Sequence, residues 1–209
     1  MPVTAKICGL STPETLDVAI AGGASHVGFV FFPPSPRNLG FDQARALVAQ
    51  VPSHVTKVGV FVDPDEAMLN AAIATGLDAV QLHKVTPERA AAIRARIPVW
   101  VAVAVKTSAD LAAALPFAGA VDRILFDAKT PDSAALPGGM GLRFDWSLLQ
   151  SYRHTQPWAL SGGLDPINVT EAIRVTGATL VDVSSGVESA PGVKDVDKIA
   201  AFLKAVSLS

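Results

Sequence analysis

Two side chains suited to proton transfer each follow an apolar segment of this chain. Cys8, the only cysteine among the 209 residues, directly follows the apolar segment Val3–Ile7. Asp127 follows Ile124-Leu125-Phe126, an apolar setting that would raise the pKa of its carboxyl. A thiolate that removes a proton and a carboxylic acid that donates one would form an acid–base pair. A single cysteine also excludes a disulfide within the chain and zinc sites built from two or four cysteines.

Both residues have a structural alternative. Most free cysteines are small buried apolar residues. Asp127 could cap a helix or pair with Lys129 instead of donating a proton. For Cys8 to act as a base the pKa of its thiol must be lowered, which helix N-termini or bound cations nearby could provide.

Arg37 ends a proline-rich loop, Phe32-Pro33-Pro34-Ser35-Pro36-Arg37. A guanidinium that a rigid loop holds over a binding site suits capture of a carboxylate by two nitrogens at once. The alternative is a solvated surface arginine. Because three prolines restrict the loop, we expect the binding role.

Two glycine-rich turns, Ser161-Gly162-Gly163 and Ser184-Ser185-Gly186, follow the seventh and eighth predicted strands. Glycine lets the backbone approach a ligand closely, and helix N-termini direct free N–H groups at anions. In (β/α)₈ barrels the loops after these two strands frequently bind phosphate. The turns therefore predict a phosphorylated small-molecule substrate, although each could be an ordinary turn.

Short β-branched segments that alternate with alanine-rich amphipathic ones would position these residues. The predicted strands are Ala5–Cys8, His26–Phe31, Lys57–Val62, Ala79–His83, Val99–Val105, Arg123–Asp127, Trp158–Ser161 and Leu180–Ser184. The predicted helices are Thr12–Ala21, Phe41–Gln50, Pro64–Thr75, Pro87–Arg96, Ser108–Phe117, Trp146–Tyr152, Pro166–Thr176 and Val196–Val206. At Asp63-Pro64 and Asp165-Pro166 a capping residue precedes a proline in the first helical position.

Eight such units predict an α/β protein with one domain over residues 1–209, a closed (β/α)₈ TIM barrel. An open doubly wound sheet is the alternative, but no G-x-G-x-x-G follows the first strand. The C-terminal ends of barrel strands carry the active site, which would place Cys8 and Asp127 on opposite sides of one mouth. His83, Asp63 and Asp127 are conceivable metal ligands, but they lie on separate strands and we predict no metal.

Composition narrows the class of protein further. Hydrophobic residues make up 50% of the chain, mean hydropathy is +0.38, and the net charge is −2. Basic residues are not clustered, which argues against nucleic-acid binding. No apolar run approaches the roughly 18 residues of a membrane span, and the N-terminus lacks a signal-peptide pattern. We therefore expect a cytoplasmic protein in a reducing compartment, without nucleic-acid or membrane partners.

Taken together, motifs between residues 6 and 195 resemble the phosphoribosylanthranilate isomerase family of tryptophan biosynthesis. They are Lys6-Ile7-Cys8-Gly9, Gly28-Phe29-Val30-Phe31, Ser35-Pro36-Arg37, Val58–Val62, Val80–His83, Leu125-Phe126-Asp127, Gly138–Gly141, Phe144-Asp145-Trp146, Ser161–Leu164, Asn168-Val169, Val181–Glu188 and Pro191–Asp195. The resemblance implies a (β/α)₈ barrel that converts N-(5-phosphoribosyl)anthranilate to 1-(2-carboxyphenylamino)-1-deoxyribulose 5-phosphate without cofactor or metal.

By this resemblance Cys8 is the general base, Asp127 the general acid and Arg37 the ligand of the anthranilate carboxylate. The substrate phosphate would be bound by Gly162, Gly163, Ser184, Ser185 and Gly186. Two further polar residues, His83 and Asp182, are predicted to line the substrate site. We expect a monomer or a homodimer.

Two positions depart from the family pattern, which usually has glycine where this chain has Lys84 and threonine where it has Met140. Two other functions stay open at this point. A related isomerase of histidine biosynthesis runs the same rearrangement, but has a carboxylate at the position of Cys8. A catalytically silent barrel that binds a phosphorylated ligand or a protein partner is the second.

Overall fold

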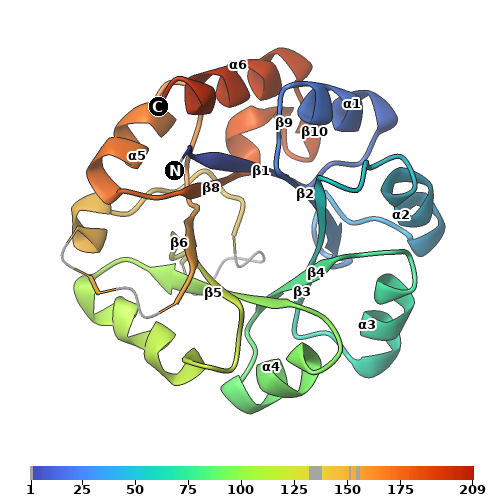
Figure 1. Ribbon diagram of the computed structural model, residues 1–209, viewed down its shortest axis with the longest axis horizontal. Coiled ribbons are helices and arrows are strands. Elements are labelled where there is room, and N and C mark those ends of the chain that lie inside the picture. The colour runs from blue at the N-terminus through green and yellow to red at the C-terminus, as the bar shows by residue number, and fades with distance from the viewer. Residues whose placement is uncertain (1, 132–137, 151, 154–155) are drawn as a thin grey trace.

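In the computed structural model (Figure 1) eight parallel strands close into a barrel that a ring of helices surrounds. The structure describes residues 2–131, 138–150, 152–153 and 156–209. Strands pair in sequence order, and β1 pairs with β8 to close the barrel. The predicted TIM barrel is therefore confirmed. The strands are β1 (Thr4–Cys8), β2 (His26–Phe31), β3 (Thr56–Val62), β4 (Ala79–His83), β5 (Val99–Val105), β6 (Arg123–Ala128), β7 (Trp158–Leu160) and β8 (Leu180–Val183).

Successive side chains of each strand point alternately into the barrel and out toward the helices. The outward set joins the helices in one large core, which includes Ile7 of β1 and Phe126 of β6. The inward set is layered. A separate apolar cluster that includes Trp100 and Leu125 fills one layer, while a small one of Cys8, Val30 and Val60 lies elsewhere in the barrel. Polar side chains can therefore occupy the interior between and beside these apolar layers.

The helices follow the strands as predicted, with shifts at two of their starts. Helix α3 begins at Glu66, because Asp63 has a left-handed φ of 42° and Asp65 is the capping residue. Helix α5 begins at Val169, because the Asp165 carboxylate accepts N–H groups inside the turn that precedes it. The α-helices are α1 (Pro13–Ala21), α2 (Phe41–Val48), α3 (Glu66–Ile73), α4 (Pro87–Arg94), α5 (Val169–Thr176) and α6 (Val196–Ser207).

Two of the predicted helices are 3₁₀-helices, η1 (Ser108–Phe117) and η2 (Trp146–Leu149). Pro116 lies inside η1 and offers no N–H for an α-helical hydrogen bond. The predicted extension of the second helix to Tyr152 crosses residue 151, which lies outside the described residues. Among the described residues no helix is long and apolar enough to cross a lipid bilayer.

An antiparallel hairpin after β8 was not predicted. The 3₁₀-helix η3 (Ser185–Val187) leads into β9 (Glu188–Ala190), which pairs with β10 (Val193–Lys194). Strands of two or three residues are too short to show alternation. The turn Pro191-Gly192 between them is the signal that could have revealed the hairpin. A Cβ on Gly192 would lie 2.7 Å from the Pro36 carbonyl oxygen, so the hairpin packs directly against the proline-rich loop.

Lys84, one of the two departures from the family pattern, is held in a left-handed conformation with a φ of 55°. Glycine adopts this conformation without strain. We expect Lys84→Gly to raise the free energy of unfolding by up to about 1 kcal/mol, because relief of about 1–2 kcal/mol of strain exceeds the added entropy of the unfolded glycine. Urea unfolding would measure the change. Lys84→Ala is the control, because it removes the same side chain beyond Cβ and keeps the strain; equal stability of the two variants would contradict this account.

Candidate active site

One cavity opens at the C-terminal ends of the barrel strands and receives side chains from nearly every strand. Of the residues predicted for the site, all but Gly186 line it: Cys8, Arg37, His83, Asp127, Gly162, Gly163, Asp182, Ser184 and Ser185. Met140, the second departure from the family pattern, also lines it and is half exposed. Barrel closure has therefore gathered residues from the whole length of the chain into one place.

Cys8 ends β1 and is nearly buried beside Val30 and Val60. Burial raises the pKa of its thiol above the ordinary value, and the Lys6 ammonium opposes this effect. The lowered pKa that a base role requires is therefore not met in the free protein, because desolvation outweighs the neighbouring positive charge. Two lysines supply positive charge near the thiol, Lys6 of the same strand and Lys194 of the hairpin.

Lys6 is fully buried inside the barrel and was not predicted as part of the site. Its ammonium lies 2.8 Å from Asp182 Oδ1 and donates to Gln81 Oε1 at 3.0 Å. Burial lowers the pKa of Lys6, but Asp182 and Cys8 overcome this, and the net pKa is raised. Lys6 thus stays protonated. Its position two residues before Cys8, on the same face of an otherwise apolar strand, is a sequence signal that could have revealed it.

Asp127 is buried at the end of β6, and its pKa is raised to about 7. Burial is the main cause and the negative charge of Asp182 the second, while the Ala128 N–H and Lys6 oppose them. The expected increase is therefore confirmed. The alternative pairing with Lys129 is not found, because the Lys129 ammonium lies 3.4 Å from Asp110 instead. At neutral pH a substantial fraction of Asp127 still holds the proton that a general acid needs.

His83 and Gln81 extend the interior polar network across β4. Burial lowers the pKa of His83 to about 4, so its imidazole is neutral near pH 7. Its Nε2 atom lies 3.2 Å from Gln81 Nε2, and Gln81 in turn accepts from Lys6. Within the described part of the chain no three His, Cys, Asp or Glu residues gather as metal ligands would, so His83, Asp63 and Asp127 do not form such a group.

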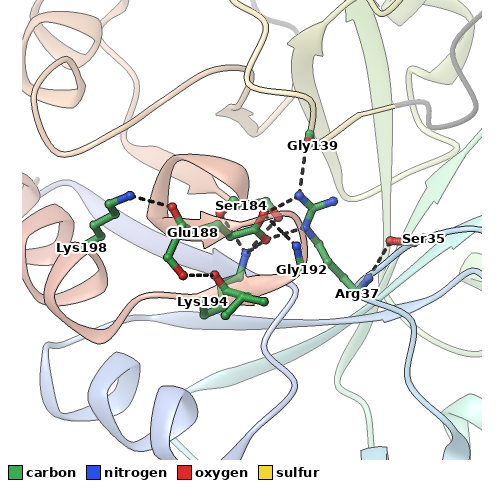
Figure 2. A network of polar contacts seen from close by, with 10 residues as sticks. Ser35, Arg37, Gly139, Ser184, Glu188, Gly192, Lys194 and Lys198 are labelled. Atoms are coloured by element: carbon green, nitrogen blue, oxygen red, sulfur yellow. Dashed lines mark hydrogen bonds and ion pairs between the residues drawn. The ribbon is translucent and has the colours of Figure 1, made fainter.

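Arg37 is buried, in contrast to the solvated arginine that was the alternative. Figure 2 shows its guanidinium turned toward Glu188 of β9. Nε and Nη2 donate to the two carboxylate oxygens at 2.7 and 2.8 Å, and Nη2 also donates to the Gly139 carbonyl at 3.0 Å. Glu188 therefore occupies the Nε and Nη2 edge, which is not open to a substrate carboxylate. Among the described residues Nη1 has no hydrogen-bond acceptor, and the role of Arg37 as the ligand of a substrate carboxylate stays a prediction.

Glu188 joins Arg37 to the lysines of the hairpin and of α6, to the first through its carboxylate and to the second through its backbone carbonyl (Figure 2). Lys194 Nζ donates to Glu188 Oε1 at 2.7 Å and to the Ser184 carbonyl at 2.9 Å. Lys198 Nζ donates to the Glu188 carbonyl at 2.7 Å. Burial raises the pKa of Glu188, but Arg37 and Lys194 overcome this and the net pKa is lowered. One ionised carboxylate thus faces two cations, which leaves excess positive charge beside the cavity.

The two glycine-rich turns fold against each other and against the acid. A Cβ on Gly162 would lie 2.5 Å from the Ala128 amide nitrogen, and one on Gly186 would lie 1.8 Å from the Leu164 carbonyl oxygen. Gly186 therefore allows the turn after β8 to touch the turn after β7, and it does not line the cavity. Its predicted contact with phosphate is not supported by this position. Gly163 and Ser185 do line the cavity.

The described end of the loop after β6 packs against both Asp127 and Arg37. A Cβ on Gly138 would lie 2.6 Å from Asp127 Oδ2, and one on Gly139 would lie 3.0 Å from Arg37 Nη1. Only glycine permits such close approach of the backbone to both side chains. The described end of this loop therefore closes over Asp127 and Arg37 together.

A (β/α)₈ barrel whose mouth holds a protonatable buried carboxyl, a thiol and an excess of positive charge is of the class of barrel enzymes that act on anionic substrates. The family model described as N-(5′-phosphoribosyl)anthranilate (PRA) isomerase matches residues 5–205. The isomerase of that name from Zymomonas mobilis subsp. pomaceae is 54% identical over 212 residues and covers 100% of both chains. The one from Paramagnetospirillum magneticum is 55% identical over 209 residues, with 98% of this chain and 97% of the relative covered.

Solved structures agree with these relatives. The phosphoribosylanthranilate isomerase of Thermotoga maritima superposes with a TM-score of 0.90 at 42% identity, covering 99% of this chain and 100% of that one. A phosphoribosylanthranilate isomerase solved with reduced 1-(o-carboxyphenylamino)-1-deoxyribulose 5-phosphate superposes with a TM-score of 0.87 at 39% identity, with the same coverage. The chain belongs to the N-(5′-phosphoribosyl)anthranilate isomerase family.

The raised pKa of Asp127 predicts that this residue costs stability at neutral and alkaline pH. Below the ordinary value of 3.8 the carboxyl is protonated in both the folded and the unfolded state. Between this pH and about 7 the unfolded state ionises it while the folded state keeps it protonated, so the free energy of unfolding falls as pH rises. Over these roughly three pH units the loss is about 4 kcal/mol. We expect Asp127→Asn to be more stable than wild type at pH 8, with a difference that shrinks toward pH 4 in urea unfolding.

The control for this measurement is Asp110→Asn. The exposed Asp110 carboxyl has a pKa lowered to about 2, mainly by the N–H groups of Thr107 and Lys106. Its ionised form is favoured in the folded state, so the variant should gain no stability at alkaline pH. A pH-independent difference between Asp127→Asn and wild type would contradict the raised pKa.

Glu188→Gln should destabilise the fold strongly, because it leaves Arg37 and Lys194 buried without their shared counter-charge. Removing one partner of a buried ion pair typically costs about 3–5 kcal/mol. Glu66→Gln is the matched control, since Glu66 pairs with two arginines in an exposed setting, where solvent screening leaves only a small loss. Similar losses in urea unfolding for the two variants would show that the hairpin network adds nothing to the fold.

Proposed function

We propose that Asp127 and Cys8 are the general acid and the general base with which this isomerase of tryptophan synthesis rearranges N-(5-phosphoribosyl)anthranilate. The observation that carries the proposal is the placement of both groups at the strand ends of one cavity, with the acid still partly protonated at neutral pH. The product is 1-(2-carboxyphenylamino)-1-deoxyribulose 5-phosphate. A relative solved with the reduced form of this compound supports the same choice of substrate.

The first step opens the sugar ring. Asp127 donates its proton to the ring oxygen while the bond between that oxygen and C1 breaks, and the anthranilate nitrogen supplies the electrons for a C1=N Schiff base. Burial makes Asp127 available as the donor, because the raised pKa keeps part of this carboxyl protonated near pH 7. The carboxylate that remains lies near Ser161 and Lys6, both of which favour its ionised form.

The second step moves a proton from carbon. The Cys8 thiolate removes the proton at C2, the electron pair of that C–H bond forms a C1=C2 double bond, and the π electrons of the C1=N bond move onto nitrogen, which gives an enolamine. C1 then gains a proton while the hydroxyl at C2 loses one, and the ketone results. Cys8 needs to be ionised at the moment of transfer, although burial favours its thiol form in the free protein.

The two anionic ends of the substrate would bind on separate sides of the acid–base pair. Nη1 of Arg37 is the donor that Glu188 leaves for the anthranilate carboxylate. The phosphate would bind at the turns that contain Gly162, Gly163, Ser184 and Ser185. The Lys194 ammonium lies behind Ser184 and donates to it, which adds positive charge to this end of the cavity.

These residues complete the rearrangement by proton transfer alone, so we propose no cofactor and no metal. A reducing cytoplasm would keep Cys8 as a free thiol. A relative from Thermotoga maritima is described as dimeric, and we propose a monomer or homodimer for this chain, with a phosphorylated small molecule and no nucleic acid or membrane as its partner.

Asp127→Asn and Cys8→Ala should each lose turnover of N-(5-phosphoribosyl)anthranilate by about 10²–10⁴-fold, the usual worth of a general acid or base. Both variants should bind the reduced product analogue about as tightly as wild type, since each keeps the groups proposed to bind carboxylate and phosphate. Turnover assays and calorimetric titration would measure the two quantities. Cys8→Ser separates basicity from size and should be as inactive as Cys8→Ala; near-normal turnover in any of the three would reject the role of the residue concerned.

A further inference from the structure

We propose that Lys6 is the positioning residue of the Cys8 base, its buried ammonium being fixed where it stabilises the thiolate. The proposal deepens the proposed function and rests on it for the catalytic role of Cys8. Lys6 and Cys8 lie two residues apart on β1, and both point into the barrel. A Cβ on Gly28 would lie 2.9 Å from Cys8 Sγ and 3.2 Å from Lys6 Cε, so both side chains lie over this one glycine.

The ammonium of Lys6 is held in place from two other strands. Asp182 of β8 accepts at 2.8 Å and Gln81 of β4 at 3.0 Å. A lysine ammonium carries three N–H donors. Among the described residues these two acceptors account for two of the donors, and the third is available to the Cys8 sulfur. Since Lys6 is fully buried, water does not compete for this donor or screen its charge.

The charges around Cys8 decide the sign of the effect. Lys6 and Lys194 favour the thiolate, whereas Asp182 and burial itself favour the thiol. His83 is neutral near pH 7, and the other groups at the cavity are Asp127 and Arg37. Lys6 is the strongest of the groups that favour the ionised sulfur. Without Lys6, burial and the Asp182 carboxylate would raise the pKa of the Cys8 thiol further, and only Lys194 would oppose them.

Lys6 also connects the two steps of the proposed reaction. Its charge lowers the pKa of Asp127 relative to burial alone, so it stabilises the carboxylate that remains after the sugar ring opens. The same ammonium then faces the sulfur from which the second step proceeds. One buried cation thus balances the negative charge that the acid leaves behind and the negative charge that the base requires.

The lone cysteine makes the test direct, because a thiol reagent reports on Cys8 alone. The rate of iodoacetamide alkylation, measured against pH on the substrate-free protein, gives the pH midpoint for ionisation of Cys8. We expect Lys6→Met to move this midpoint upward by at least about one pH unit. We expect kcat to fall at least about tenfold, with the affinity for the reduced product analogue little changed.

Lys57→Met is the matched control. Lys57 also pairs with an aspartate, Asp78 at 3.0 Å, but it is the second residue of β3, at the strand end opposite the cavity, and does not line the cavity. Its loss should leave both the alkylation midpoint and turnover unchanged. If Lys6→Met does not fold because Asp182 is left without a partner, Lys6→Met/Asp182→Asn removes both charges. This double variant should show a smaller upward shift, because loss of the Asp182 charge acts in the opposite direction.

An unshifted alkylation midpoint in the folded single or double variant would overturn the proposal, and so would a shifted midpoint with undiminished kcat. A failure of the proposed function appears in a different measurement, as retained turnover of Cys8→Ala. The two failures are therefore distinguishable.

Discussion

Pairing of β1 with β8 is the constraint on which the rest of the structure depends. This pairing closes the barrel, and its register sets Lys6 directly beside Asp182. Closure removes water from the interior and places an ammonium and a carboxylate within 2.8 Å of each other. This pair acts on both proposed catalytic groups: Asp182 contributes to the raised pKa of Asp127, and Lys6 acts on Cys8. An open sheet would leave these residues on opposite edges.

A second buried ionic group, around Glu188, performs a different task at the rim of the barrel. It ties the proline-rich loop after β2 to the hairpin after β8 through Arg37, and ties the hairpin to Ser184 through Lys194. Buried ion pairs often add little net stability compared with apolar packing, because both ions lose their hydration. What this group provides is geometry: the two loops proposed to hold the two ends of the substrate cannot move independently.

The buried charges inside the barrel suit the reaction of the family to which the chain belongs. A rearrangement that needs both an acid and a base requires two groups with suitable pKa values, and here burial shifts the pKa values of both groups. Apolar clusters inside the barrel, one of which includes Cys8 itself, contribute to that burial. The glycines at 138, 139 and 162 then let backbone approach the acid and the arginine closely enough to exclude water from them.

The amino-acid sequence by itself determined the order and approximate bounds of the eight strand–helix units, the closed barrel, and the presence of a thiol, a carboxyl and an arginine at its mouth. These follow from local patterns, namely alternation, caps and the position of a residue at a strand end. The family resemblance supplied the reaction. The starts of α3 and α5 were misplaced because capping signals at Asp63 and Asp165 serve turns that precede those helices.

Only the tertiary structure decided which charges meet. Lys6 meets Asp182 across 176 residues of sequence, and Arg37 meets Glu188 across 151. No local pattern encodes such a contact, because the pairing depends on strand register and on the hairpin that returns over the barrel. Burial inside the closed barrel raised the pKa of Cys8, and Glu188 took the Nε and Nη2 edge of Arg37. Desolvation and long-range pairing are properties of the closed fold, so the residue types were evident from the sequence while their protonation states and free donors were not.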